Sequence, residues 1–451
     1  MTDHTFHPDP APEPRTLPDL SGRSFLLLQG PQSGFFRELA KGLREAGALV
    51  EKVNFCGGDV LLWGMGHAFC YRGTRYEWLS WVGKIYRGRH ITDICVYGDW
   101  RPMHWEAIRL ADTLGIRIWV YEEGYLRNSY STLEEFGVNG RSRLPKTAGG
   151  IRALSQQLGP NTTPVEHHEN DIVDKVVQAI KHHAGNFFLW PFFRHYRTHR
   201  PSNIAFELIG ILPRYFSRAR RARRDAKRLR EFHAKRAPYF FFPLQLNSDS
   251  QIQLYSPYVR MHEAIADVLT SFAKHAPKNT HLLIKNHPLD NGLIDYDTFV
   301  KAFSSELGIA DRVTFVDFGN TGQMVGRSLG VVLVNSAMMP TVLVNSTVGI
   351  MALEKEIPVY CLGHSIYNIE GLAQSWPLVS LKDFWKAPAA PDKSLFEDFR
   401  NVVAQCASVA GNFYGAEGIQ AAVKSSLKRF AKPRRTSDPD PRYAPPGLLT
   451  R

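Results

Sequence analysis

The chain lacks several features that assign a protein to a class. No apolar run in its 451 residues approaches the roughly 18 that a membrane-spanning helix needs. Its five cysteines are widely scattered without a CxxC pair, so they indicate neither a disulfide framework nor a metal site. The acidic, proline-rich N-terminus has no signal-peptide core. We therefore expect a cytoplasmic protein without a metal or other cofactor.

Common nucleotide and hydrolase motifs are also missing. The sequence contains no GxxxxGK[ST] loop, no GxGxxG after its first predicted strand, no HExxH and no GxSxG. These absences disfavour ATP hydrolysis, hydride transfer and serine hydrolysis.

The net charge of +12 is concentrated in one segment. Residues 191–236 hold 14 Lys/Arg against three acids, which is +11. Aromatic and apolar residues, including those of 204–216, lie beside the arginines, but no zinc-finger or RRM signature is present. Such a mixture suits anionic lipid headgroups. We interpret the segment as basic, amphipathic and membrane-facing, and expect no nucleic-acid partner.

Strands and helices alternate in two rounds, which predicts an α/β fold with parallel sheets. The first round has strands at 24–30, 49–55, 93–99 and 117–124, and helices near 35–43 and 102–114. The second has strands at 239–246, 280–288, 312–318, 342–346 and 358–363, and helices near 257–274 and from 348. We expect tails at 1–20 and 431–451, and two Rossmann-like domains at 21–190 and 237–430 that face a cleft.

Ligands of such sheets bind beyond the carboxyl ends of the strands. Two strand ends in the second round carry phosphate-binding residue types, and an acid follows on the next helix. These donor-site candidates are Lys285, His287 and Pro288, then Asn345, Ser346 and Thr347, with Glu354 for a ribose. Each residue alone also fits a helix cap or a surface side chain.

The strand ends of the first round carry acids instead. Glu122 and Glu123 end one strand, Asp99 ends another, and Glu134 and Glu135 follow in TLEEFGVN. Carboxylates beside a cleft supply a general base or a nucleophile for glycosyl transfer. Because adjacent strand residues point to opposite faces, one acid of each pair at most should face the substrate.

Seven ordered blocks between about 25 and 418 resemble the capsule polysaccharide biosynthesis/export family KpsS/LipB. They are LLLQGPQSGFF, NFCGGD, YGDWRPMHWEA, YEEGYLRNSYSTLEEFGVN, LNSDSQI, IKNHPLD and NSTVGIMAL. The resemblance implies a GT-B-like retaining β-Kdo transferase. Such an enzyme moves Kdo from CMP-Kdo to a phosphatidylglycerol-type lipid, on the inner face of the cytoplasmic membrane, with other capsule synthesis and export proteins as further partners.

The same resemblance carries roles onto particular residues. His287 and Pro288 match the HP motif and Asn345 to Thr347 the NST turn, both implied to contact CMP. The two Glu pairs match the EEGYLR and TxEExGVN blocks, without indicating which acid is the nucleophile. Asn128 replaces a common Pro, and about ten extra residues surround a VLVNS repeat. The alternative function is a non-catalytic membrane-docking component of a capsule export complex.

Overall fold

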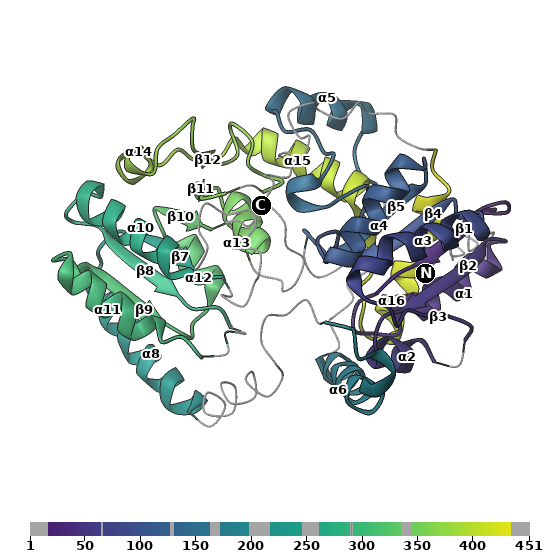
Figure 1. Cartoon of the computed structure of the whole chain (residues 1–451). Coiled ribbons are helices and arrows are strands. Elements are labelled where there is room, and N and C mark those ends of the chain that lie inside the picture. The colour runs from purple at the N-terminus through teal and green to yellow at the C-terminus, as the bar shows by residue number, and fades with distance from the viewer. Residues whose placement is uncertain are drawn as a thin grey trace, which may run out of the picture.

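The computed structural model describes residues 17–433, apart from 65, 127–129, 163–171, 198–216, 246–260, 289, 291, 335–344 and 364. Two sheets of mostly parallel strands lie side by side, each with helices packed against it (Figure 1). This confirms the predicted pair of Rossmann-like α/β units. Residues 246–260 and 335–344, which follow strand ends of the second sheet, lie outside the described part. The cleft therefore stays a prediction.

The first sheet has seven strands in the order β13-β6-β5-β4-β1-β2-β3. The strands are β1 (Ser24–Leu27), β2 (Leu49–Asn54), β3 (Phe69–Cys70), β4 (Asp93–Tyr97), β5 (Arg117–Glu123), β6 (Tyr130–Glu135) and β13 (Ser408–Ala410). β4 is buried over its whole length, as expected of a central parallel strand covered on both faces. β6 runs antiparallel to β5 and to β13.

Alternate residues of these strands enter two separate cores. Leu26, Ile94 and Val120 pack on one face, whereas Phe25, Cys95 and Tyr121 pack on the other. The helices and 3₁₀ turns of this unit are α1 (Phe35–Glu45), α2 (Gly57–Trp63), α3 (Arg75–Gly88), α4 (Pro102–Thr113), η1 (Asn139–Arg141), α5 (Ala148–Leu158), α6 (Ile172–Phe188), η2 (Trp190–Phe193) and α16 (Ala416–Phe430).

The second sheet has six strands in the order β12-β11-β10-β7-β8-β9, each pair parallel. They are β7 (Tyr239–Pro243), β8 (His281–Lys285), β9 (Val313–Val316), β10 (Gly330–Leu333), β11 (Val359–Cys361) and β12 (Gln374–Ser375). Its helices are α8 (Arg218–Ala234), α10 (Met261–His275), α11 (Tyr296–Glu306), η3 (Ala310–Arg312), α12 (Thr321–Gly326), α13 (Asn345–Glu354), α14 (Leu381–Lys386) and α15 (Lys393–Ala407).

The first copy of the VLVNS repeat contributes to β10, whereas the last two residues of the strand predicted at 342–346 are helical. Residues 342–344 lie outside the described part, and Asn345 already begins α13. The strand that pairs with β11 is β10. The helix predicted from 348 therefore begins three residues earlier.

The C-terminal end of the chain differs from the predicted boundaries. β13 pairs with β6, and α16 packs on α1, so residues 408–430 belong to the first sheet and not to the unit 237–430. Gly42 lets these helices approach closely, because a Cβ there would lie 2.8 Å from Val423. Packing of α15 against α5 also joins the two units.

α8 forms the described C-terminal part of the basic segment 191–236. Although α8 carries charge on nearly every side, one of its sides packs against β9. The physical reason is ion pairing: Arg221, Arg224 and Arg228 meet three acids, which are Asp225, Asp297 and Asp317. Among the described residues, no helix is long and apolar enough to cross a membrane.

Candidate active site

The register between β5 and β6 sorts the four predicted glutamates onto two faces of the first sheet. Glu134 lies opposite Val120, so it shares a face with Glu122, two residues along β5. Glu135 lies opposite Trp119 and shares the other face with Glu123. The expectation that the members of each pair point to opposite faces is confirmed.

Glu135 has a structural environment. Its Oε1 lies 2.7 Å from Nε of Arg117, which begins β5, and this places Glu135 at the amino end of that strand. Arg117 also lies over the Trp119 ring, 4.5 Å from its centroid. The pair therefore fastens the hairpin at the end opposite to the one where ligands of such sheets bind.

Glu134 is buried within a hydrogen-bond network. The Tyr125 hydroxyl donates to its Oε1 at 2.9 Å, and the Ser142 hydroxyl donates to its Oε2. Burial raises the pKa of Glu134 to about 7, while these two donors and the Lys146 ammonium oppose the rise. Burial also lowers the pKa of Lys146 to about 8. Tyr125, Ser142 and Lys146 were not predicted, since nothing in their local sequence marks them as partners.

Glu122 lies at the carboxyl end of β5 and is 3% exposed. Among the described residues, its Oε2 has no hydrogen-bond partner. Its pKa lies well above the usual range, first because of burial and then because of the neighbouring charges of Glu123 and Asp99, which Arg101 partly offsets. A buried carboxyl group with a raised pKa at a strand end is a feature of functional sites.

Glu123 is the accessible acid at this strand end. It is half-buried, and its Oε1 lies 3.9 Å from the Lys175 ammonium of α6. Thr132 of β6 donates its hydroxyl hydrogen to the Glu123 carbonyl oxygen at 3.0 Å and so fixes the backbone here. A reacting group of a substrate can approach Glu123 more readily than it can approach Glu122.

Asp99 follows β4 and holds the loop after β6. Its Oδ2 accepts the backbone N–H of Val138 at 3.1 Å and lies 3.9 Å from the Arg141 guanidinium. Burial raises the pKa of Asp99, and Arg141 opposes this rise. These contacts give Asp99 a role in positioning the loop, next to the carboxyl end of β5.

The predicted donor residues begin at the end of β8. Lys285 and His287 are buried, and Pro288 is exposed. Burial lowers the pKa of Lys285, while the charge of Asp317 opposes the fall. Between them, Asn286 donates to Asp317 at 2.9 Å and accepts the His287 backbone N–H at 2.8 Å. The loop is therefore fixed by its own contacts.

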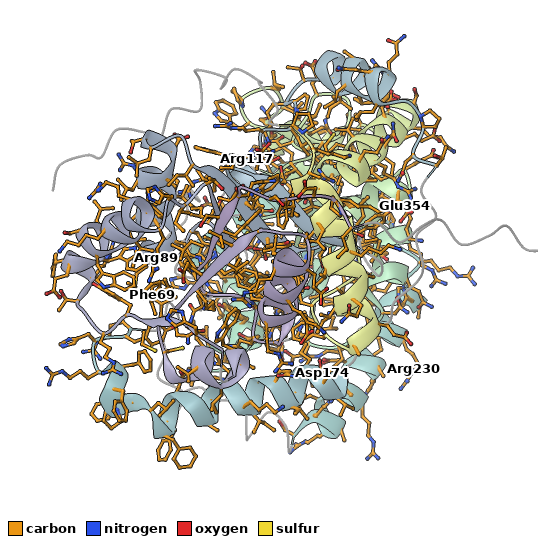
Figure 2. All side chains as sticks on the ribbon, turned by 90° about the vertical axis from the view of Figure 1, so that its right-hand side faces the viewer. Phe69, Arg89, Arg117, Asp174, Arg230 and Glu354 are labelled. Atoms are coloured by element: carbon orange, nitrogen blue, oxygen red, sulfur yellow. The ribbon has the colours of Figure 1, made fainter. Side chains whose placement is uncertain are left out.

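The remaining donor residues lie at α13. Asn345, Ser346 and Thr347 form its first turn, but their side chains lie outside the described part. Glu354 (labelled in Figure 2), at the other end of α13, is exposed and lies 3.5 Å from Arg400 of α15. The contact of these residues with a nucleotide stays a prediction.

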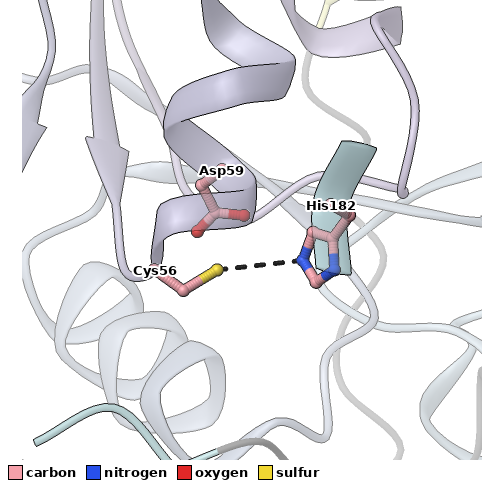
Figure 3. Close-up of side chains that lie close together, drawn as sticks. All are labelled: Cys56, Asp59 and His182. Atoms are coloured by element: carbon pink, nitrogen blue, oxygen red, sulfur yellow. Dashed lines mark hydrogen bonds between the residues drawn. The ribbon is translucent and has the colours of Figure 1, made fainter. Parts of the chain in front are cut away.

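A second cluster of reactive side chains lies between α2 and α6. Cys56, Asp59 and His182 are buried, and one potential metal ligand from each lies within 4.8 Å of the others (Figure 3). The Cys56 Sγ is 3.8 Å from His182 Nε2. However, both Asp59 oxygens already accept hydrogen bonds from Gln29, and Oδ2 also accepts the Phe55 N–H.

The hydrogen-bond pattern suits this cluster without a cation. Asn186 accepts the Gly58 N–H at 2.8 Å, which turns its amide nitrogen toward His182 Nδ1. Nδ1 is then an acceptor, and Nε2 carries the proton toward Cys56. Burial raises the pKa of the Cys56 thiol, and the Lys52 ammonium lies close enough to be affected by Asp59 and Cys56. We therefore interpret the cluster as a structural contact between the helices.

Comparison with known proteins agrees with the sequence blocks. Residues 92–414 match the family described as capsule polysaccharide biosynthesis protein. The chain is 32% identical over 400 residues to the capsule polysaccharide export protein KpsS of Escherichia coli, covering 88% of this chain and 98% of that one. It is 30% identical over 405 residues to the capsule polysaccharide modification protein LipB of Neisseria meningitidis serogroup A, covering 87% of this chain and 92% of that one.

Two solved structures align with most of the chain, but at lower sequence identity than these relatives. Anabaena HepE in complex with UDP and glucose aligns over 91% of this chain and 94% of its own, at 12% identity and a TM-score of 0.27. The lipopolysaccharide outer core galactosyltransferase WaaB aligns over 84% of this chain and 99% of its own, at 9% identity and a TM-score of 0.29. The family assignment depends on the sequence matches. The chain belongs to the capsule polysaccharide biosynthesis protein family.

Proposed function

We propose that the protein is a retaining glycosyltransferase that moves Kdo from CMP-Kdo to a phosphatidylglycerol-type lipid and so starts the oligo-Kdo linker of a capsular polysaccharide. Family membership supports a role in capsule assembly, and the two α/β units suit a GT-B-like enzyme. The observation that carries the proposal is the group of acids at the carboxyl end of β5, where Glu122 is buried and Glu123 accessible. We place the enzyme on the cytoplasmic face of the membrane, with other capsule proteins as partners.

Retention follows from two displacements at the same carbon. In the first, a carboxylate attacks the anomeric carbon of Kdo, and CMP leaves with the electrons of the broken C–O bond. In the second, the lipid hydroxyl attacks that carbon, the carboxylate leaves, and the hydroxyl proton passes to a base. Glu123 suits the nucleophile because a substrate can reach it. Glu122 is buried on the opposite face of β5, and burial raises its pKa.

The CMP moiety would lie on the second unit, near Lys285 and His287. An acid close to that loop, Asp317, would repel a phosphate if it were alone. Its carboxylate instead lies 3.1 Å from Arg221 and 3.2 Å from Arg224 of α8. This pairing offsets the negative charge and so favours attraction of an anion to the Lys285 ammonium.

The direct test is incubation of the purified protein with CMP-Kdo and a fluorescent phosphatidylglycerol. The expected result is a lipid mass increase of one Kdo together with release of CMP. A non-catalytic docking component of an export complex, the alternative function, would bind membranes without releasing CMP. Absence of both products in the presence of correctly folded protein would contradict the proposal.

A further inference from the structure

An exposed apolar stripe runs along α6 and η2. On α6 it consists of residues that are 41–78% exposed, namely Val173, Val176, Val177, Ile180, Phe187 and Phe188, and η2 adds Trp190 and Phe192 at 64% and 56%. The spacing of three and four residues places the α6 members on one side of the helix. Contiguous exposed apolar surface on a protein marks an interaction site.

The stripe is held outward by close packing on the opposite side of α6. A Cβ added to Gly57 of α2 would lie 2.0 Å from the Gly185 carbonyl oxygen, so the two helix backbones touch. The Gly58 N–H donates to Asn186 of α6 at 2.8 Å. With 3.6 residues per turn, Gly185 and Asn186 lie across the helix from Ile180 and Phe187. Rotation of α6 to bury the stripe would break this contact.

The segment that carries the stripe has a net positive charge. Residues 173–197 contain four Lys/Arg and one acid, a net charge of +3. The acid, Asp174, accepts hydrogen bonds from Gln178 and from the Gly415 backbone. Arg72 lies over the Phe192 ring, 5.6 Å from its centroid. An anionic surface complements this arrangement. The same segment of a second copy carries the same positive charge, so two copies would repel each other here.

We propose that α6 and η2 insert their apolar side chains into the headgroup region of an anionic phospholipid bilayer. A helix with this composition lies in the interface plane, with its apolar face about 5–10 Å deep. Aromatic side chains favour that depth, and Lys181 and Arg194 can extend to the headgroups. In Figure 1, α6 and the start of α8 lie along the same lower edge of the molecule, so the basic helix would face the same surface.

Figure 2 shows the same geometry from the side. α6, the helix that carries the labelled Asp174, runs along the lower edge, and the labelled Arg230 of α8 points outward near that edge. The membrane contact predicted for residues 191–236 thus extends to residues 173–192, upstream of most of the arginines. The inference depends on the proposed function only in that the bilayer would contain the lipid acceptor.

The test uses the full-length protein and vesicles of phosphatidylglycerol with phosphatidylcholine, compared with phosphatidylcholine alone. We expect co-sedimentation with the anionic vesicles. The double variant Phe187→Ser, Phe188→Ser should partition roughly tenfold to a hundredfold less, because two aromatic side chains no longer leave water. The matched control is Leu49→Ser, Leu378→Ser, which replaces two leucines that are each 69% exposed elsewhere. The control should bind like the wild type.

Two outcomes would overturn the inference. One is wild-type vesicle binding by the Phe187, Phe188 variant. The other is a dimer, seen by analytical ultracentrifugation, that this variant converts to a monomer, because the stripe would then be covered by a second copy. Transfer of Kdo to a lipid acceptor in detergent micelles separates this inference from the proposed function. The Phe187, Phe188 variant should keep that transfer activity in micelles. If the wild-type protein shows no transfer there, only the proposed function is contradicted.

Discussion

Replacement of Glu134 by Gln should remove a pH dependence from the stability of the protein. The ordinary pKa of this carboxyl is 4.5, and in the folded protein it is raised to about 7. Between these values the folded state keeps a proton that the unfolded state has lost. The wild-type protein therefore loses stability as the pH rises from 4.5 to 7, and the loss levels off above 7.

The magnitude follows from the size of the shift. Each pKa unit corresponds to 1.36 kcal/mol, so the two values give an upper bound of about 3 kcal/mol for the loss. Gln is close in shape to the protonated acid: its oxygen can accept from Tyr125, and its amide can donate to Ser142. Near pH 5 the Glu134→Gln variant should match the wild type within about 1 kcal/mol. At pH 7.5 it should be the more stable protein.

Thermal unfolding followed by tryptophan fluorescence between pH 5 and 7.5 measures this difference. At about 2 °C per kcal/mol, the variant should gain up to about 6 °C relative to the wild type across the range. Lys146→Met provides the control, because it removes the ammonium that favours the ionised carboxylate. The stability loss should then continue to higher pH. Parallel pH curves for the wild type and the Glu134→Gln variant would refute the reasoning.

Three other predictions address the sites. Glu123→Gln should abolish Kdo transfer and keep CMP binding, and transfer by this variant would contradict the role of Glu123 as nucleophile. Glu135→Gln should instead keep transfer and lower the melting temperature. His287→Ala should weaken CMP binding about ten- to a hundredfold by calorimetry, and unchanged affinity would remove His287 from the donor site. A chelator or added zinc should leave the melting temperature unchanged, and a zinc-dependent increase that Cys56→Ser abolishes would show that the cluster binds metal.

The sequence predicted most central strands because they are short apolar runs. DICVY and YFFFP are buried throughout, and they form β4 and β7 close to the predicted bounds. The strands β6 and β13 were missed because YSTLEE and SVA lack a continuous apolar run. Their pairing depends on contacts between residues about 280 positions apart, which local patterns do not encode.

The sequence predicted which residue types form the candidate site, but not the surroundings of each side chain. The sequence placed two Glu pairs near a strand end, and only the β5–β6 register separates Glu122 and Glu123 from Glu135. Burial and partners from other segments, such as Lys146, shift the pKa of Glu134, and the local sequence does not reveal either. The apolar stripe of α6 was also missed, although the spacing of Val173, Val177 and Ile180 could have indicated it.

The basic helix α8 allows a last prediction, because its charges divide into two sets. Arg221, Arg224 and Arg228 are paired with buried or half-buried acids of the second unit. Five others are exposed, namely Arg218, Arg220, Arg223, Lys227 and Arg230. Each basic residue near an anionic membrane contributes about 1 kcal/mol, and salt screens the attraction. Serine at the five exposed positions should therefore weaken binding to phosphatidylglycerol vesicles without lowering the melting temperature, and the remaining binding should depend less on salt. Serine at the three paired positions should instead lower the melting temperature, because the fully buried Asp225 would lose its guanidinium partners. If the two sets weaken vesicle binding equally, and neither affects unfolding, the division of α8 into a membrane side and a protein side is wrong.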